Sequence, residues 1–418
     1  MSDFDALLAN YTSKETPKVH GVICKCVDRH GICPTPHLAK RDLRLTLLGN
    51  EIYSKVAGYD SVLPGASPLR EDVVLKVASA TKLITSIALL QCIDKGLIDL
   101  DEPVTKVLPE FDQKQILTDV SGSDLVLEPS KTPITARHLL THTSGLGYPF
   151  THRLLRLRAE VRNRAGVSPS LRVTERYEMP LVFEPGTGWL YGCSLDWAGV
   201  IVSRLHGGIS LEQYFVENIW QRLGLSEPFP CFNIARHPEY NARVMGGAIQ
   251  TPEGRLQPKD HWAFDNPEDQ DGGSGLSCTT KDYVAVLADL VSDSPKLLKP
   301  ATIAEMFTPQ LEAKSPGVQM LLGLRPAWDT VSGPIAENAI NHGLGGVLCM
   351  DDVPEIDQPK GMLGWGGASN IVWWVNRELR VAGFFATQQA PFGNPSVTRL
   401  VNAWKKDFWA QFKTIDHA

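Results

Sequence analysis

The chain has 418 residues, 43% of them hydrophobic and 21% charged, so it can bury a large core in one big domain or two interleaved ones. Its net charge is only −6, and we read its lysines and arginines as dispersed, which predicts neither a nucleic-acid nor a membrane partner. The eight cysteines are scattered, and the first residues contain no basic segment followed by an apolar one. These features predict a cytoplasmic protein whose partner is a small molecule.

The first predicted elements are strands, followed by one long helix. Residues 20–28 and 43–59 run apolar in short bursts with turn residues between them, which is typical of a hairpin in a sheet. Residues 78–95 are apolar almost all round and precede Gly96, so they predict a buried helix with a glycine cap at its end.

The rest of the chain is predicted to be helical in the middle and to return to strands near the end. Helices are expected at 135–142, 194–206, 210–223, 279–292 and 395–412, and strands at 370–376 and 379–387. Strands at both ends around a helical middle predict an α+β fold in which the termini share one antiparallel sheet. We expect residues 1–95 and 272–418 to form the sheet domain, residues 96–271 a mainly helical domain, and the site to lie between them.

Ser79-Ala80-Thr81-Lys82 is the motif that carries chemistry, because it is the only SxxK in the sequence. A serine hydroxyl is a poor nucleophile until a base removes its proton, and an amine one helical turn further on can assist. At the start of a helix, free N–H groups also favour developing negative charge. The alternative is a helix-capping serine followed by a solvated lysine.

Four segments occur in the order found in serine β-lactamases and family VIII esterases: SATKLITSIALLQCIDKGLIDLDEPV, ITARHLLTHTSGL, FEPGTGWLYGCSLDWAG and GGSGLSCTTKDY. The resemblance is closer still to the fungal lovastatin acyltransferases (simvastatin synthases), which esterify a polyketide alcohol. It extends from about Val19 to about Pro395 and implies a β-lactamase/transpeptidase-like fold.

The resemblance implies that Ser79 is the nucleophile and that Tyr191 and Lys82 share the proton taken from it. It places the oxyanion hole at the backbone N–H groups of Ser79 and Ala368. Without the resemblance, a buried aromatic with a satisfied hydroxyl is the better interpretation of Tyr191. Residues 365–368 would then be equally well explained as a β-bulge with a core tryptophan.

Two features depart from the family pattern. Trp365 stands where β-lactamases place a charged residue that holds the carboxylate of the drug, so we do not expect antibiotic hydrolysis. Cys193 and Ser194 stand where an Asn often follows the tyrosine, which leaves that role open. The resemblance implies a substrate pocket whose aromatic wall suits a bulky hydrophobic molecule and which is lined by Tyr148, Phe150, Trp365, Gly366, Gly367 and Phe392.

Other motifs are weaker. His138 and His142 have the spacing of two zinc ligands but lack a glutamate and a third ligand, so helix packing explains them better. Cys24 and Cys26 share one face of a strand and are expected to be core residues. Residues 272–276 (GGSGL) lack the ending of a phosphate loop and predict a tight turn. We therefore expect no metal and no cofactor.

The resulting functional prediction is serine-dependent acyl transfer from a thioester or ester to an alcohol of a hydrophobic natural product. An acyl-carrier protein or coenzyme A could present the thioester. The alternatives are a carboxylesterase acting on hydrophobic esters and a non-catalytic binding protein on the same fold.

Overall fold

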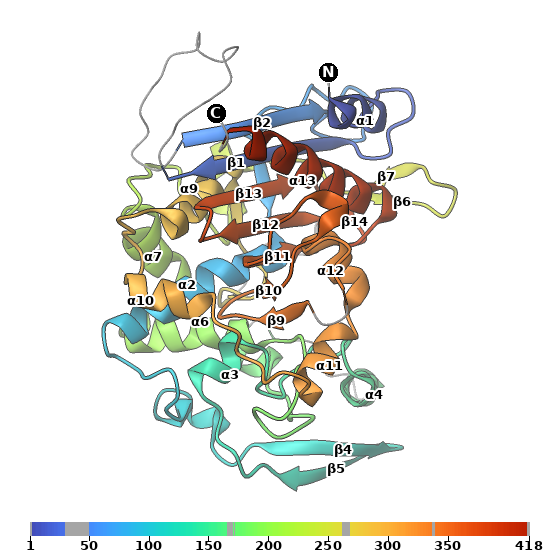
Figure 1. The fold of residues 1–418 in the computed structure, drawn as a ribbon. Helices are drawn as coiled ribbons and strands as arrows, with labels where there is room; N and C mark the ends of the chain where they lie inside the picture. Colours follow the sequence, from blue (N-terminus) through green and yellow to red (C-terminus); the bar gives the residue numbers. More distant parts are fainter. Residues whose placement is uncertain are drawn as a thin grey trace.

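The fold is organised around a seven-stranded antiparallel sheet with the strand order β2-β1-β13-β12-β11-β10-β9 (Figure 1). The computed structural model describes residues 2–29, 50–164, 170, 172–260, 268–336 and 339–415. The strands of this sheet are β1 (Gly21–Asp28), β2 (Asn50–Gly58), β9 (Ile340–His342), β10 (Val347–Cys349), β11 (Met362–Gly367), β12 (Ile371–Asn376) and β13 (Val381–Ala386). Segments from the two ends of the chain therefore meet in one sheet.

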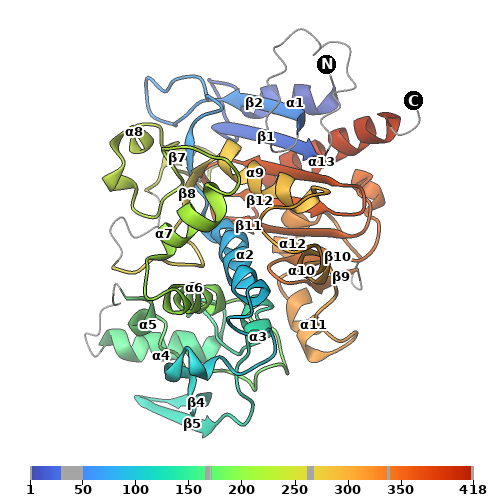
Figure 2. The same ribbon diagram turned by 90° about the vertical axis from the view of Figure 1, so that its left-hand side faces the viewer.

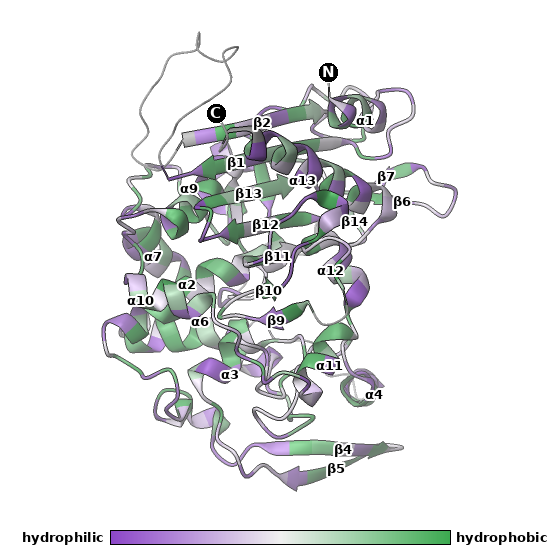
Figure 3. Cartoon of the chain, in the orientation of Figure 1, coloured by the Kyte–Doolittle hydropathy of each residue, from purple (hydrophilic) through white to green (hydrophobic). Residues whose placement is uncertain are grey.

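Helices cover both faces of this sheet. On one face, α13 (Pro395–Ile415) lies beside α1 (Asp3–Tyr11), and the ring of Trp374 on β12 contacts Trp404 and Trp409 of α13. On the other face, Tyr283 of α9 (Thr280–Val291) stacks on Phe384 of β13. Figure 3 shows β13 as hydrophobic along its length, as expected for a strand buried on both sides.

The buried helix α2 (Thr81–Asp94) runs through the middle of the molecule among several other helices, as Figure 2 shows. These other helices are α3 (Ala136–Leu140), α4 (Arg153–Arg164), α5 (Val173–Arg176), α6 (Ser194–Leu205), α7 (Leu211–Phe215) continued by a π-helical turn Val216–Trp220, α8 (Pro238–Asn241), α10 (Pro300–Met306), α11 (Pro316–Leu322) and α12 (Arg325–Val331). Short 3₁₀ turns cover Ala78–Ala80, Val104–Lys106, Pro109–Phe111, Ile234–Arg236 and Pro354–Ile356.

Small sheets complete the architecture. β3 (Val74–Lys76) pairs with β8 (Ser277–Thr279), while β14 (Gln389–Ala390), β6 (Ala248–Gln250) and β7 (Leu256–Pro258) form a three-stranded sheet. A hairpin of β4 (Gln115–Ser121) and β5 (Asp124–Pro129) projects far from the main sheet (Figure 1). The expectation of a mainly helical middle did not include this hairpin, although the turn glycine Gly122 has a φ of +63°, which glycine adopts readily.

Most predicted elements are confirmed with small shifts at their ends. Helices occur at α3, α6, α9 and α13 and strands at β1, β12 and β13, while residues 43–49 of the predicted second strand lie outside the described residues. The prediction of one helix over 78–95 needs a correction, because Ser79 lies in a 3₁₀ turn and the α-helix begins at Thr81. The cause is local: Ala78 has a φ of +46°, which the α-helix cannot accommodate. The 210–223 helix is likewise interrupted by a π-helical turn.

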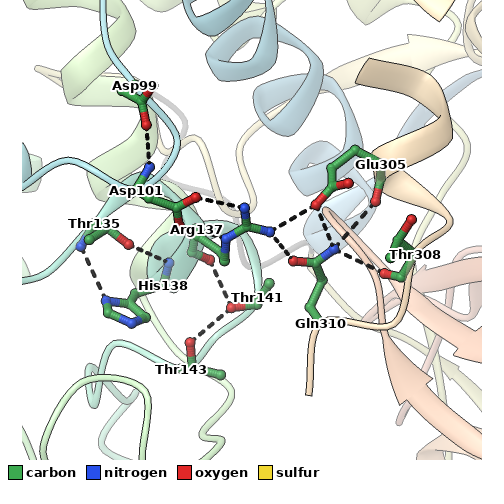
Figure 4. A network of polar contacts seen from close by, with 10 residues as sticks. All are labelled: Asp99, Asp101, Thr135, Arg137, His138, Thr141, Thr143, Glu305, Thr308 and Gln310. Atoms are coloured by element: carbon green, nitrogen blue, oxygen red, sulfur yellow. Dashed lines mark hydrogen bonds and ion pairs between the residues drawn. The ribbon is translucent and has the colours of Figure 1, made fainter. Parts of the chain in front are cut away.

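Arg137 on α3 joins the loop at Asp101 to the end of α10 and the segment after it in a polar network (Figure 4). Its Nε and Nη2 atoms each donate to Asp101 at 2.7 Å, and its Nη1 donates to Glu305 at 2.9 Å and also to Gln310. The hydrogen bonds that it donates to Asp101 raise the pKa of Arg137 further above its ordinary value. This network fixes the helix from which the 142–147 segment continues toward the site.

The basic residues are not uniformly dispersed, contrary to the expectation from composition. Helix α4 holds five arginines and one glutamate among its 12 residues, and Leu155 is its only buried residue. Arg153, Arg156 and Arg164 are exposed on it because helical spacing gathers them on the solvent side. Among the described helices, none combines the length and the apolar composition needed to cross a lipid bilayer.

Candidate active site

Ser79 is held in a tight turn between β3 and α2. The Ala80 N–H donates to the Val77 carbonyl at 3.0 Å, and the Ala80 carbonyl accepts from the Tyr283 hydroxyl at 2.8 Å. Gly367, the last residue of β11, lies directly against this turn, since a β-carbon on it would come 2.2 Å from the Val77 carbonyl oxygen. The sheet edge therefore reaches the serine only because a glycine is present there.

The three residues expected to be catalytic lie within contact of one another. Ser79 Oγ and Tyr191 Oη form a hydrogen bond of 2.5 Å, in which either oxygen can donate. Lys82 Nζ donates to Ser79 Oγ at 3.4 Å and lies 4.8 Å from the centre of the Tyr191 ring. This arrangement gives the serine hydroxyl a phenol oxygen and an amine as immediate partners for its proton.

Lys82 also donates hydrogen bonds to two groups that the sequence did not lead us to expect. Its Nζ donates to the Gly273 carbonyl at 2.7 Å and to the Tyr148 hydroxyl at 3.3 Å. The Tyr148 hydroxyl in turn donates to Asp196 at 2.8 Å, and Asp196 also accepts from the Gly273 N–H at 2.9 Å. Burial raises the pKa of Asp196 above its usual range, although the charge of Lys82 opposes this.

Asp196 was missed although a signal for it was present. It stands among the apolar residues of the predicted 194–206 helix, where a carboxylate that is fully buried needs partners. Tyr148, expected only as pocket wall, has a polar function as well: burial and the neighbouring Asp196 raise the pKa of its phenol. The GGSGL segment does turn tightly, but its Gly273 backbone also bonds both Lys82 and Asp196.

Cys193 and Ser194 stand where the family often has an asparagine, and neither contacts Lys82. The Ser194 hydroxyl shares a 2.9 Å hydrogen bond with Ser144, and the Cys193 thiol lies 3.9 Å from the Gly147 carbonyl. The Tyr148 hydroxyl instead contacts the lysine.

A cavity of about 430 Å³ opens over Ser79 and Tyr191, and most of its wall is apolar. It brings together every residue expected to bind substrate and the expected second oxyanion donor: Tyr148, Phe150, Trp365, Gly366, Gly367, Phe392 and Ala368. Phe150 is 71% exposed and its ring stacks on Tyr148 with centroids 5.3 Å apart, so it stands at the mouth. The sequence did not indicate the opposite wall, which α12 supplies through Ala327, Trp328 and Val331.

A buried ion pair between Arg176 and Asp271 borders the same cavity. Burial and the nearby Asp196 raise the pKa of Asp271 to about 7, against the effect of Arg176. Sequence reasoning missed this pair, because its members are far apart in the chain.

The histidine and cysteine motifs take part in helix capping and in packing of the core. His138 Nδ1 accepts from the Thr135 N–H at 3.2 Å in a helix-capping arrangement, and the buried His142 ring stacks on Trp365 with centroids 5.8 Å apart. Cys24 and Cys26 are buried in β1. Within the described residues, no group of three or more histidine, cysteine, aspartate or glutamate side chains could hold a metal ion.

Comparison with known proteins identifies the family. The Beta-lactamase family model matches residues 45–405 of this chain. The chain is 33% identical over 381 residues to lovastatin esterase from Penicillium rubens, covering 87% of this chain and 92% of the relative. It is 35% identical over 353 residues to monacolin J acid methylbutanoyltransferase from Aspergillus terreus, covering 83% and 84%. Unliganded simvastatin synthase from Aspergillus terreus superposes with a TM-score of 0.83 at 30% identity, over 98% of both chains.

These likenesses confirm the α+β, β-lactamase/transpeptidase-like fold and set aside the alternative of a non-catalytic binding protein. The chain belongs to the β-lactamase family, and within it to the enzymes that transfer acyl groups or hydrolyse esters.

Proposed function

We propose that this enzyme moves an acyl group from a thioester or ester to an alcohol of a hydrophobic, polyketide-like molecule through an ester on Ser79. The observation that carries the proposal is the 2.5 Å contact between Ser79 Oγ and Tyr191 Oη at the floor of a largely apolar cavity. The relatives named as acting on monacolin J acid and lovastatin support a polyketide-like acceptor.

In the first half-reaction, Ser79 Oγ attacks the acyl carbonyl while its proton passes to Tyr191, which reacts as a phenolate, with Lys82 beside both groups. The tetrahedral intermediate then collapses, the bond to the leaving thiol or alcohol breaks, and the leaving group takes the proton. The acyl group remains on Ser79 as an ester.

The backbone N–H groups of Ser79 and Ala368 are the proposed oxyanion hole. Both residues border the cavity, and the close contact of Gly367 with Val77 brings the end of β11 to the serine turn. Donors fixed in this way need no reorganisation when the oxyanion forms, which is the main advantage of such a site.

In the second half-reaction, an acceptor hydroxyl transfers its proton to the Tyr191 phenolate and attacks the acyl-Ser79 carbonyl. The bond between the acyl group and Ser79 Oγ then breaks, and Ser79 takes the proton back from Tyr191. If water attacks instead, the enzyme is a carboxylesterase. The relative named lovastatin esterase favours this second candidate. The outcome depends on how well the acceptor excludes water from the cavity.

The acceptor is proposed to lie against Tyr148, Phe150, Trp365, Gly366, Gly367 and Phe392. A thioester on an acyl-carrier protein or coenzyme A is the proposed donor, and the proposed compartment is the cytoplasm.

The test is the mass of the intact protein after mixing with p-nitrophenyl butanoate or a short-chain thioester, with and without a hydrophobic alcohol. An adduct that persists until the alcohol is added identifies an acyltransferase, and rapid release of acid without alcohol identifies an esterase. Ser79→Ala should form no adduct. Tyr191→Phe should slow adduct formation by about 10²-fold or more. Equal adduct formation in Ser79→Ala would remove the serine from its role.

A further inference from the structure

Lys82 and Asp196 are joined by a closed ring of hydrogen bonds. One arm runs from Lys82 Nζ to the Tyr148 hydroxyl at 3.3 Å and from this hydroxyl to Asp196 Oδ2 at 2.8 Å. The other arm runs from Lys82 Nζ to the Gly273 carbonyl at 2.7 Å and from the Gly273 N–H to Asp196 Oδ1 at 2.9 Å. The Asp196 carboxylate therefore accepts hydrogen bonds from both Tyr148 and Gly273, which in turn accept hydrogen bonds from Lys82. Asp196 does not touch the lysine itself.

The charges nearby leave Asp196 as the counter-charge of Lys82. Both side chains are buried, with Asp196 at 0% and Lys82 at 2% exposure. The other ionic groups of this region, Arg176 and Asp271, form an ion pair with each other. A buried charge without a partner is strongly destabilising. Asp196 is the carboxylate that hydrogen bonds connect to Lys82, although the charge of Lys82 also acts on Asp271.

The hydrogen bonds also decide which direction the lysine protons point. An ammonium group has three N–H donors, and Lys82 has three acceptors: Gly273 O, Tyr148 Oη and Ser79 Oγ. Since the Tyr148 proton is used toward Asp196, the phenol oxygen accepts from Lys82. Lys82 is thus a donor toward Ser79, and Tyr191 is the remaining partner that can accept the serine proton.

We infer that Asp196 is a positioning residue for acyl transfer: through Tyr148 and Gly273 it holds Lys82 as a directed cation, and this makes Tyr191 the proton acceptor. The inference rests on the proposed function of Ser79.

Several titratable or charged groups besides Asp196 lie around this network and contribute to the pH dependence of activity. They come from the 142–148 segment, α5 and the residue after it, the 191–193 segment and the 271–273 turn: His142, Tyr148, Arg176, Tyr177, Tyr191, Cys193 and Asp271. Any test of Asp196 must therefore compare whole pH profiles and not one pH value.

The experiment measures the acylation burst of the full chain with p-nitrophenyl butanoate from pH 5 to pH 10 for wild type, Asp196→Asn, Tyr148→Phe and the double variant. Asp289→Asn is the matched control, because Asp289 is also a buried carboxylate that accepts two backbone hydrogen bonds, at 2.8 and 3.1 Å, away from the site. Thermal unfolding of each variant accounts for losses of stability.

In Asp196→Asn we expect the burst rate to fall about 10- to 100-fold, as for a misdirected catalytic group, with little change in KM because Asp196 does not line the cavity. The alkaline limb of the profile should move to lower pH, since removing a negative charge from a hydrogen-bonded network favours loss of a proton from the network. Tyr148→Phe should act in the same direction, and the double variant should lose less than the product of the two single effects.

A burst rate and pH profile in Asp196→Asn equal to those of Asp289→Asn would overturn the inference. So would a loss of rate without any movement of the alkaline limb, because that is what a merely structural role gives. A wild type without a burst, or a burst that persists in Ser79→Ala, would instead contradict the proposed function.

Discussion

Gly367 at the end of β11 lies so close to Val77 that a β-carbon on the glycine would be 2.2 Å from the carbonyl oxygen of the valine. The two residues come from opposite ends of the chain, and their contact sets the distance between the sheet edge and the turn that holds Ser79. The absence of a side chain at Gly367 thus allows the two backbones to approach. The segment Trp365-Gly366-Gly367 also forms part of the cavity wall.

The substitution Gly367→Ala should therefore displace the serine turn from β11 and slow acylation by about 10²-fold, because a shift of about 1 Å suffices for such a loss. The measurement is the burst rate with p-nitrophenyl butanoate. Gly317→Ala is the control, since a β-carbon there would have its nearest neighbour at 3.6 Å, an ordinary contact. Equal burst rates in the two variants would show that the close approach is not needed.

Removing the guanidinium in Arg137→Met should lower the free energy of unfolding by about 1–3 kcal/mol, because Asp101 and Glu305 lose charge-assisted hydrogen bonds. The exposed Arg153→Met on α4 is the matched control, with an expected change within about 0.5 kcal/mol. Urea denaturation measures both. A similar stability of the two variants would mean that the network in Figure 4 contributes nothing net.

At the mouth of the cavity, Phe150→Ala should raise KM for a bulky hydrophobic alcohol several-fold while leaving acylation by a small ester nearly unchanged. The reason is that Phe150 offers apolar surface to a large acceptor at a position 71% exposed to solvent. Leu63→Ala removes another exposed apolar side chain away from the cavity and should change neither constant. An unchanged KM in Phe150→Ala would exclude the ring from acceptor binding.

Stability should fall as the pH drops from about 6.5 to about 4, in part because of His342. Burial lowers the pKa of this ring from 6.5 to about 4. In that interval the unfolded chain binds a proton that the native protein does not, so unfolding takes up a proton and the free energy of unfolding decreases, by about 3 kcal/mol in total for this group.

Denaturation series at several pH values in wild type and His342→Gln measure this effect. The variant should show a slope against pH that is smaller by up to one proton between pH 4 and pH 6.5. A slope that does not differ between the two proteins would mean that His342 does not titrate in this way.

Local pattern in the sequence determined most of the elements. Strands β12 and β13 and helices α3, α6, α9 and α13 follow from apolar periodicity and turn residues, because burial on one or both faces leaves a repeat that is visible along the chain. The ordered motifs also led to Ser79, Lys82 and Tyr191, and the resemblance that these motifs carry supplied their expected roles.

Tertiary structure alone decided what surrounds these residues. The turn at Ser79 departs from the predicted helix because of the backbone of Ala78. Tyr148 and Gly273 meet at Lys82 from segments far apart in the chain, and Asp196 binds both of them. No repeat or spacing in the sequence predicts these contacts, because hydrogen bonds between distant segments depend on how the sheet and the helices pack. For the same reason the sequence indicated an apolar cavity but not the α12 wall or the Arg176–Asp271 ion pair that border it.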